Sequence, residues 1–414
     1  MRVAVLFDNL GPYHVARLAR AAERMDVLAV EANRTSMDYG WDAPDLPDGL
    51  RRAGLDPGDG AAPAGWRALT GLVERRVGPF RPDAVAVPGW SSGAALGMAA
   101  WAGTRDLPVI VMSDTNEWDT PRRTVMEGIK RRVVRRFSAG LCAGEPQKRY
   151  LVAMGLAPDA VFLGYDVVDN AHFAAGAERV RAAGEMPAMG DGRPLDARWR
   201  GRYLLASARF VPKKNLPRLI RAYGLYRARA QAGGDDAWPL VMLGDGAMRA
   251  ELEALRDELG LAPHIHMPGF RQYGELPAFY GTAGAFILPS TTEQWGLVVN
   301  EAMASGLPVL VSRRCGCADT LVRDGANGWT FDPEDERAMA EVMHRVASDT
   351  ARDGMGRASR QIVAQWGPDR FADGLHAAAR RALAAPARKA GPVDSALMRL
   401  VASVQDRRRL RHAA

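Results

Sequence analysis

Short apolar runs alternate with segments of helical periodicity along this chain, and the alternation occurs twice. The first half has apolar runs at 2–8, 26–31, 83–88, 108–112, 139–143 and 160–163, with helical segments at 13–25, 65–77, 92–103, 121–136 and 145–154. The second half has runs at 203–208, 239–243, 264–267, 285–289, 308–312 and 328–331, with helical segments at 215–231, 247–259, 274–281, 296–305, 335–348 and 351–364. Such alternation is typical of parallel sheets covered by helices. Because 414 residues exceed what one core usually supports, we expect two doubly wound, Rossmann-like α/β domains that face each other across a cleft.

Two carboxylates flank one of these strand-to-helix junctions. Glu293 follows the apolar run 285–289, and Glu301 lies about one and a half turns inside the helix expected at 296–305. The backbone N–H groups of Trp295, Gly296 and Leu297 would face an anion at the start of that helix, where the helix dipole favours negative charge. The segment therefore predicts a diphosphate site between two acceptors of hydroxyl hydrogen bonds, as a nucleotide-sugar site requires.

A second candidate for phosphate binding follows the first strand of the second half. The chain uses arginine freely, but lysine occurs only at positions 130, 148, 213, 214 and 389. A lysine pair directly between a strand and a helix, with Arg209 before it, indicates a phosphate loop. An arginine offers a planar fork to two oxygens, and Lys214 offers a compact point charge.

The net charge of +7 is concentrated in two segments. Residues 122–136, from Arg122 to Arg136, hold seven basic residues and one acidic residue, and residues 386–414 hold seven basic and two acidic residues. Local patches of this kind do not indicate a nucleic-acid binder. The first is either a solvated helix face or a contact with an anionic membrane surface or an anionic acceptor.

Further features of the sequence indicate where the protein works. No apolar run is long enough to span a membrane, and the chain enters a strand directly, so we expect a cytoplasmic protein that lies, at most, peripherally on the inner membrane face. Three cysteines cannot build a disulfide framework, and Cys315-Gly-Cys317 lacks partner ligands at metal-binding spacing. We expect no bound metal and no cofactor.

The segment from Glu293 to Glu301, with the continuation Ala-Met-Ala-Ser-Gly-Leu-Pro-Val, resembles the Glu-x7-Glu signature of the retaining glycosyltransferases of group 1 (family 4), which have the GT-B fold. The resemblance implies that Glu293 holds sugar hydroxyls and that Glu301 holds the ribose of the nucleotide. The loop from 207 to 215 is similar to the family's Gly-Arg-x-x-x-x-Lys-Gly loop, which implies that Arg209 and Lys214 bind the donor diphosphate. Ala208 and Asn215 replace the two glycines, and Lys213 is the alternative if the register slips by one.

Other donor-side motifs of the family occur with less specific matches. Gly244 and Gly246 look like its Gly-x-Gly turn, which has a structural role near the ligand. Phe270 lies in a segment that resembles the turn beside the nucleotide base. Gly11 stands where the family usually has two adjacent glycines that approach the donor phosphates or the acceptor.

Two residues are candidates for the acceptor side. His14 is either a general base or acceptor ligand, or a surface residue of the helix. Asp114 stands in a loop where many members of the family carry a histidine, and this departure puts a histidine-based role in doubt.

The resemblance implies five parts of the chain. They are an acceptor-side domain at 1–173, a linker or insertion at 174–200, a domain for the nucleotide sugar at 201–365, a crossover helix at 366–385 and a basic tail at 386–414. It implies a retaining hexosyltransferase, with a UDP-sugar favoured as donor and a hydroxyl of a glycan, a lipid-linked molecule or a small molecule as acceptor. The alternatives are a phosphorylase, a synthase of the sucrose or trehalose type, and a non-catalytic scaffold in polysaccharide assembly.

Overall fold

The computed structural model describes residues 1–33, 40–56, 66–119, 122–385, 396 and 398–402. The chain divides into two compact units, and each is described here by itself. Unit 1 is Met1–Val167 together with Pro368–Ala414, and unit 2 is Val168–Gly367. No helix in the described part of the chain is long and apolar enough to cross a membrane.

The sheet of unit 1 is parallel and buried on both faces. Its described strands are ordered β3-β2-β1-β4-β5-β6-β7, so the order reverses between β1 and β4. Unbroken apolar runs such as Val3 to Leu6 produce such strands, because side chains on both faces meet covering helices. The strands are β1 (Arg2–Phe7), β2 (Asp26–Glu31), β3 (Arg51–Gly54), β4 (Ala84–Pro88), β5 (Val109–Ser113), β6 (Ala139–Cys142) and β7 (Val161–Leu163).

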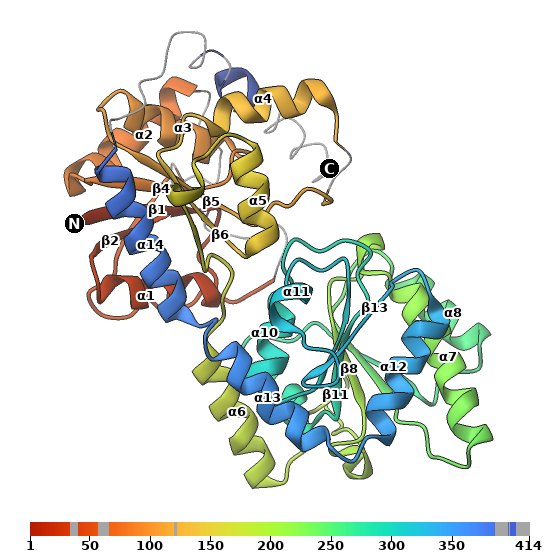
Figure 1. Cartoon of the computed structure of the whole chain (residues 1–414). Coiled ribbons are helices and arrows are strands. Elements are labelled where there is room, and N and C mark those ends of the chain that lie inside the picture. Colours follow the sequence, from red (N-terminus) through yellow and green to blue (C-terminus); the bar gives the residue numbers. More distant parts are fainter. Residues whose placement is uncertain (34–39, 57–65, 120–121, 386–395, 397, 403–414) are drawn as a thin grey trace. The chain divides into compact units, whose positions relative to one another are not determined.

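Helices cover both faces of this sheet. Val3 and Val5 pack in one core with α1 and α14, whereas Ala4 and Leu6 pack in another core with α2 to α5, as the alternation of side chains along a strand requires. Figure 1 shows α1 and α14 side by side on the sheet. The helices are α1 (Pro12–Ala22), α2 (Trp66–Val77), α3 (Gly93–Gly103), α4 (Thr124–Val134), α5 (Glu145–Ala153) and α14 (Pro368–Leu383).

Unit 2 repeats the same topology in a smaller sheet. Its described strands are parallel and ordered β10-β9-β8-β11-β12-β13, so the order reverses between β8 and β11. Ligands of open α/β sheets bind outside the carboxyl ends of the strands at such a reversal. The strands are β8 (Leu204–Ser207), β9 (Leu240–Leu243), β10 (Ile265–Gly269), β11 (Ala285–Leu288), β12 (Val309–Ser312) and β13 (Gly328–Phe331).

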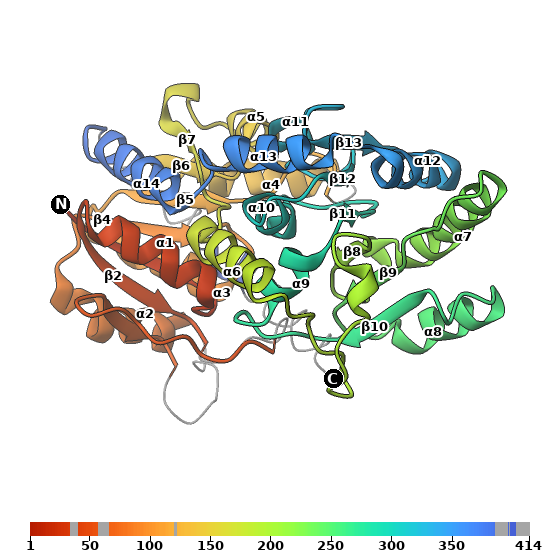
Figure 2. The ribbon, with the colours of Figure 1, turned by 90° about the horizontal axis from the view of Figure 1, so that it is seen from below.

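The helices of unit 2 also form two layers. Those of one layer, α7, α8 and α12, share a core with the sheet, and α6, α9 and α10 pack against each other in the second layer (Figures 1 and 2). The helices are α6 (Asn170–Ala183), α7 (Leu216–Ala232), α8 (Arg249–Glu258), α9 (Leu276–Thr282), α10 (Leu297–Ala304), α11 (Ala318–Leu321), α12 (Glu336–Ser348) and α13 (Arg352–Val363).

Two parallel, doubly wound sheets confirm the expected fold class, while the expected cleft concerns the relative placement of the units and stays a prediction. The structure differs from the expected pattern in three segments. The helix α6 extends to Ala183, so the first part of the stretch expected as a linker is helical and packs on α9. The short strand β3 pairs with β2 inside a segment that carries no strand pattern in the sequence. The expected tail 386–414 lies mostly outside the described residues, but Met398 and Ala402 are buried in the core of unit 1.

Candidate functional site

Two loops at the strand-order reversal of unit 2 bring opposite charges into contact. One loop follows β8 and carries Lys214, and the other follows β11 and carries Glu293. The Lys214 Nζ donates to the Glu293 carboxylate, and the two side chains are only 11% and 12% exposed. The Ser290 hydroxyl donates to the same carboxylate oxygen at 3.4 Å. The structure therefore places a cation and a carboxylate predicted from the sequence together, at the edge where ligands of this topology bind.

Asn215 fixes the loop that carries Lys214. Its backbone is left-handed, with φ 60°, and it ends the single 3-10 turn Pro212–Lys214. The buried Asn215 Nδ2 donates to the carbonyl oxygens of Pro289 (3.0 Å) and Pro333 (2.7 Å). The Thr291 N–H donates to the Lys213 carbonyl at 2.9 Å. Side-chain and backbone hydrogen bonds thus join the two loops, which sets Lys214 opposite Glu293.

The turn after β9 supports Arg209. The Phe210 N–H donates to the Asp245 carbonyl at 2.8 Å, which holds the Arg209 segment against this turn. A Cβ at Gly244 would overlap the Ala208 carbonyl oxygen, and one at Gly246 would lie 2.7 Å from the Phe210 oxygen. Only glycine permits this approach of two backbones, and both glycines also have positive φ. Their packing contact is with the loop that carries Arg209 and Lys214.

The helix α10 begins at a position that only glycine adopts easily. Gly296 precedes it with φ 106°, and Leu297 is its first residue. The Gly316 N–H donates to the Glu293 carbonyl at 3.0 Å, which anchors this approach to the helix. The Trp295 side chain is turned into the core, where its Nε1 donates to Asn300 at 3.0 Å, so this residue can offer a ligand only its backbone. The first turn of α10 can meet an anion through the N–H groups near Gly296 and Leu297.

The second carboxylate of the motif is held by a tyrosine that the sequence pattern does not reveal. Glu301 is 1% exposed, and the Tyr280 hydroxyl donates to its Oε2 at 2.8 Å. Burial, and then Glu301, raise the pKa of Tyr280, which therefore remains a hydroxyl donor. Ser207, at the end of β8, forms a further hydrogen bond with this tyrosine. Tyr280 thus connects Glu301 to β8, the strand that precedes the loop with Arg209 and Lys214.

Phe270 directly follows β10 and is 36% exposed. An exposed aromatic side chain at this position can stack on a planar ligand group. Together the unit 2 residues provide cations for an oxyanion, two carboxylates for hydroxyl groups and an aromatic surface.

In unit 1, Gly11 and His14 lie at the turn between β1 and α1. The Gly11 N–H donates to the His14 Nδ1 at 3.0 Å, and the half-buried imidazole packs on Phe7. Among the described atoms, a Cβ at Gly11 would meet only His14 Nδ1, at an ordinary 3.7 Å. Packing within unit 1 therefore does not require a glycine at position 11. The Leu10 N–H donates to the buried Glu31 at 3.1 Å, and this support for the turn has no signal in the sequence.

The hydrogen bond from Gly11 decides what His14 can do. Burial of the ring and the nearby charge of Arg17 lower its pKa from 6.5 to about 3, so the imidazole is neutral near pH 7. Since Nδ1 accepts a backbone N–H, the proton of the neutral ring lies on Nε2. His14 can then donate a hydrogen bond to a ligand oxygen, but its free ring nitrogen cannot act as a general base. The geometry favours the role of acceptor ligand.

Asp114 follows β5 at the same edge of the unit 1 sheet. It lies close enough to Tyr165 to contribute, with Asp166 and after burial, to the raised pKa of that phenol. Arg17 pairs with Asp166 at 3.5 Å and lies over the Tyr165 ring. Arg17, Tyr165 and Asp166 are buried, so they form with Asp114 a largely buried polar cluster in unit 1.

The cysteines form no metal site in the described structure. Cys142, Cys315 and Cys317 are buried thiols, and burial raises the pKa of Cys315 well above its usual range. Among the described residues, no group of three His, Cys, Asp or Glu side chains could hold a metal ion.

Asn215 yields a prediction about stability. Asn215→Gly keeps the left-handed backbone but loses both side-chain hydrogen bonds, so we expect the free energy of unfolding to fall by about 1–3 kcal/mol. Asn215→Ala loses the same bonds and adds left-handed strain of about 1–2 kcal/mol. Urea unfolding of the three proteins checks this order. Equal stability of the glycine and alanine variants would show that the loop does not hold this backbone conformation.

His14 yields a prediction about protonation. Long-range ¹⁵N–¹H spectra should show the neutral tautomer with the proton on Nε2, unchanged between pH 5 and 8. The pKa of His14 is lower in the folded than in the unfolded chain, so the unfolded chain binds more protons. The contribution of His14 to the free energy of unfolding is therefore present above pH 6.5 and is lost as the pH falls toward about 3. A ring that titrates near pH 6.5 in the folded protein would contradict the described hydrogen bond.

A comparison with known families finds a match over most of the second half of the chain. The family model described as glycosyl transferases group 1 matches residues 195–362. A D-inositol 3-phosphate glycosyltransferase of Thermobifida fusca is 36% identical over 133 residues, which are 32% of this chain and 30% of that protein. A sucrose-phosphate synthase of Zea mays is 28% identical over 157 residues, which are 35% of this chain and 15% of that protein. The chain thus spans about a third or less of the length of these curated relatives.

Solved structures extend the likeness to both units. Anabaena HepE in complex with UDP and glucose has a TM-score of 0.67 at 17% identity, with 90% of this chain and 98% of that chain covered. A UDP-forming trehalose-phosphate synthase of Burkholderia xenovorans has a TM-score of 0.66 at 14% identity, with 92% and 98% covered. At these identities the likeness concerns the fold alone. Residues 195–362 thus match the model of the group 1 glycosyl transferases, and the two parallel-sheet units of the chain have the fold of the GT-B type.

Proposed function

We propose that this protein is a retaining glycosyltransferase that moves a sugar, a hexose, from a nucleotide-sugar donor to a hydroxyl of a glycan, a lipid-linked molecule or a small molecule. The observation that carries the proposal is the contact between Lys214 and Glu293 at the strand-order reversal of unit 2. One partner suits a phosphate and the other suits sugar hydroxyls, so their contact matches a molecule in which a sugar is joined to a phosphate.

The donor would lie along the carboxyl edge of the unit 2 sheet. Arg209 and Lys214 would bind the diphosphate, with the N–H groups at the start of α10 as further donors. Glu293 would accept hydrogen bonds from the transferred sugar, Glu301 from the ribose, and Phe270 would lie beside the base. Lys214 has three N–H donors, so it can contact Glu293 and a phosphate oxygen at the same time.

In the proposed reaction, the bond between the anomeric carbon and the diphosphate breaks as the acceptor oxygen bonds to that carbon on the same face. The proton of the acceptor hydroxyl leaves with the diphosphate. Arg209 and Lys214 would stabilise the negative charge that develops on the leaving group, which is often the largest contribution to catalysis in such sites. We propose that no metal or cofactor is needed, because cationic side chains serve the phosphates.

The acceptor would be bound by unit 1. Gly11 leaves space at the β1–α1 turn, His14 can donate from Nε2, and Asp114 can accept. These groups suit hydroxyl oxygens.

The second candidate function is a synthase that uses a sugar phosphate as acceptor. Two similar proteins are named as synthases of sugar phosphates, which favours this candidate.

We propose a UDP-sugar as donor, since HepE is described in complex with UDP and glucose. We also propose a cytoplasmic protein that contacts the inner membrane face peripherally through residues 122–136. The charge of this segment supports the contact, because anionic lipids attract clustered arginine and lysine.

The role of Lys214 can be tested by turnover. Lys214→Met should lower kcat at least ~10²-fold, as the loss of a charge-stabilising donor does in other enzymes. Lys213→Met is the matched control, because it removes the same charge from the neighbouring position, and it should leave kcat nearly unchanged. A larger loss of kcat in Lys213→Met than in Lys214→Met would assign the phosphate role to Lys213. Normal turnover of both variants would refute a phosphate role for either lysine.

A chelator should leave wild-type activity intact, and a strict need for Mg²⁺ or Mn²⁺ would contradict the metal-free mechanism.

Glu301 and Tyr280 can be tested through the ribose. Calorimetric titration should show that the wild type binds UDP at least about tenfold more tightly than 2′,3′-dideoxy-UDP, since hydrogen bonds to a charged group contribute about 1.5–3 kcal/mol. Glu301→Ala should bind both nucleotides equally, and Tyr280→Phe should discriminate less than the wild type.

Tyr223→Phe is the control for Tyr280→Phe. Tyr223 is also fully buried, and its hydroxyl donates to the Trp238 carbonyl at 2.9 Å. This variant loses a comparable buried hydrogen bond but should keep full discrimination between the nucleotides. Full discrimination in Glu301→Ala would refute the ribose role.

A further inference from the structure

A short hairpin at residues 187–195 lies in the segment of unit 2 that the sequence indicates as a linker or insertion. Ala188 pairs with Pro194 in an antiparallel bridge, and the Met189 N–H donates to the Arg193 carbonyl at 2.7 Å. A two-stranded hairpin is marginally stable at best by itself in water. The conformation of this hairpin therefore depends on the residues against which it packs.

The hairpin packs on the turn that carries Phe270. The Arg271 Nη2 donates to the Ala188 carbonyl at 3.2 Å and to the Pro268 carbonyl at 3.0 Å, so one guanidinium joins the hairpin to the turn. A Cβ at Gly190 would lie only 2.8 Å from the same Pro268 oxygen. Two contacts of the hairpin thus meet at a carbonyl group two residues before Phe270.

Arg271 is also held by its own helix and loop. Its guanidinium lies over the Phe279 ring, 5.6 Å from the ring centroid, and its Nη1 lies 3.7 Å from the Glu275 carboxylate. The side chain is only 13% exposed. An anchored Arg271 therefore holds the backbone from which the neighbouring Phe270 side chain, 36% exposed, extends.

The chain after the hairpin is held on β10. The rings of Trp199 and His266 lie 4.6 Å apart, and β10 is the outermost described strand of the sheet. A segment beside an outermost strand commonly covers a sheet edge. The contact of Arg271 with Ala188 lies beyond Gly269, the last residue of β10, so the covering of an edge does not account for it.

We propose that the hairpin 187–195 positions Phe270 for the base of the donor, with Arg271 and Gly190 as positioning residues. The inference rests on the proposed donor site, in which Phe270 lies beside the base. A loop that is already held in its bound conformation loses less freedom when the ligand binds, which raises the affinity. The hairpin contributes in this way to the affinity for the base, and not to the affinity for the diphosphate, which the loop after β8 binds.

The test measures the affinity that the base itself adds. Calorimetric titration compares UDP with ribose 5-diphosphate, which lacks the base. The wild type should bind UDP at least about fivefold more tightly, since stacking of a base on an aromatic side chain contributes at least this much. Gly190→Ala and Arg271→Met should each lower this preference at least about threefold, because the ring is no longer held. Both should keep the wild-type affinity for ribose 5-diphosphate, which also shows that they fold.

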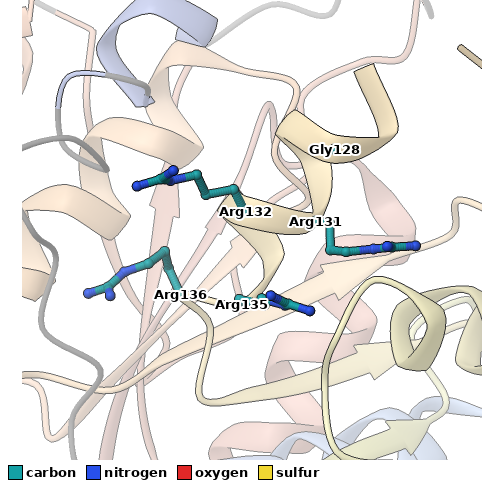
Figure 3. A pocket seen from close by; sticks show the side chains of 5 residues that line it. All are labelled: Gly128, Arg131, Arg132, Arg135 and Arg136. Atoms are coloured by element: carbon teal, nitrogen blue, oxygen red, sulfur yellow. The ribbon is translucent and has the colours of Figure 1, made fainter. Parts of the chain in front are cut away.

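Two controls match these variants. Gly274→Ala adds the same methyl group in the loop after Phe270, where no described atom lies within 4 Å of a Cβ and φ is not positive. Arg131→Met removes the same side chain and charge from the exposed surface of α4 in unit 1, beside Gly128 and the other arginines in Figure 3. Both controls should keep the full preference for UDP.

Phe270→Leu separates positioning from direct contact. This variant should lose the preference for UDP, and Gly190→Ala added to it should cause no further loss, because the hairpin acts through the ring. A further loss in the double variant would overturn the positioning role. Full preference in both Gly190→Ala and Arg271→Met would also overturn it, and either result would leave the donor site intact.

The wild type distinguishes the remaining outcomes. Equal binding of UDP and ribose 5-diphosphate would show that the base does not stack on Phe270, which overturns this inference but not the diphosphate site. A wild type that binds neither compound would overturn the proposed donor site itself, and the positioning role with it.

Discussion

The site of unit 2 depends on the parallel pairing of β8 with β11, through Leu204 with Ala285 and Leu205 with Phe286. The segments that follow these two strands continue into helices on opposite sides of the sheet, α7 and α10, so the loops separate and leave room for a ligand between them. Lys214 and Glu293 meet at this place. Their contact follows from the sheet order, because no local feature of either loop brings two residues so distant in sequence together.

The loops around this place contain unusual backbone conformations. Asn215 is left-handed, Gly296 precedes α10 with positive φ, and Gly244 lies against the Ala208 carbonyl. Such conformations persist only where hydrogen bonds and packing hold them, and they fix the direction of neighbouring side chains before a ligand arrives. The ion pair itself adds little to stability, because two charges taken out of water lose much of their hydration. The ion pair instead holds Lys214 and Glu293 in a fixed arrangement.

Local surroundings also decide the role of charged and titratable side chains in unit 1. Within the basic segment 122–136, Glu127 pairs with Arg122 and Lys130, and the Tyr150 hydroxyl donates to the same carboxylate. His14 likewise owes its chemistry to its surroundings. A backbone N–H occupies Nδ1, which decides the tautomer and therefore whether the ring gives or takes a hydrogen bond.

The sequence by itself determined the fold class and most of the elements, because apolar runs and helical periodicity are local and a parallel sheet needs both. It also indicated Arg209, Lys214, Glu293 and Glu301, since strand-to-helix junctions with charged residues recur where such sheets bind ligands. It missed most of α6, an alanine-rich helix with a weak apolar stripe, which begins at the Asp169 cap and packs on α9. Only the tertiary structure decided that Lys214 contacts Glu293, that Tyr280 holds Glu301 and that Asn215 joins two loops. Each of these contacts joins residues far apart in the chain, and such partners are chosen by the order of the strands and the packing of the helices, which no local pattern records.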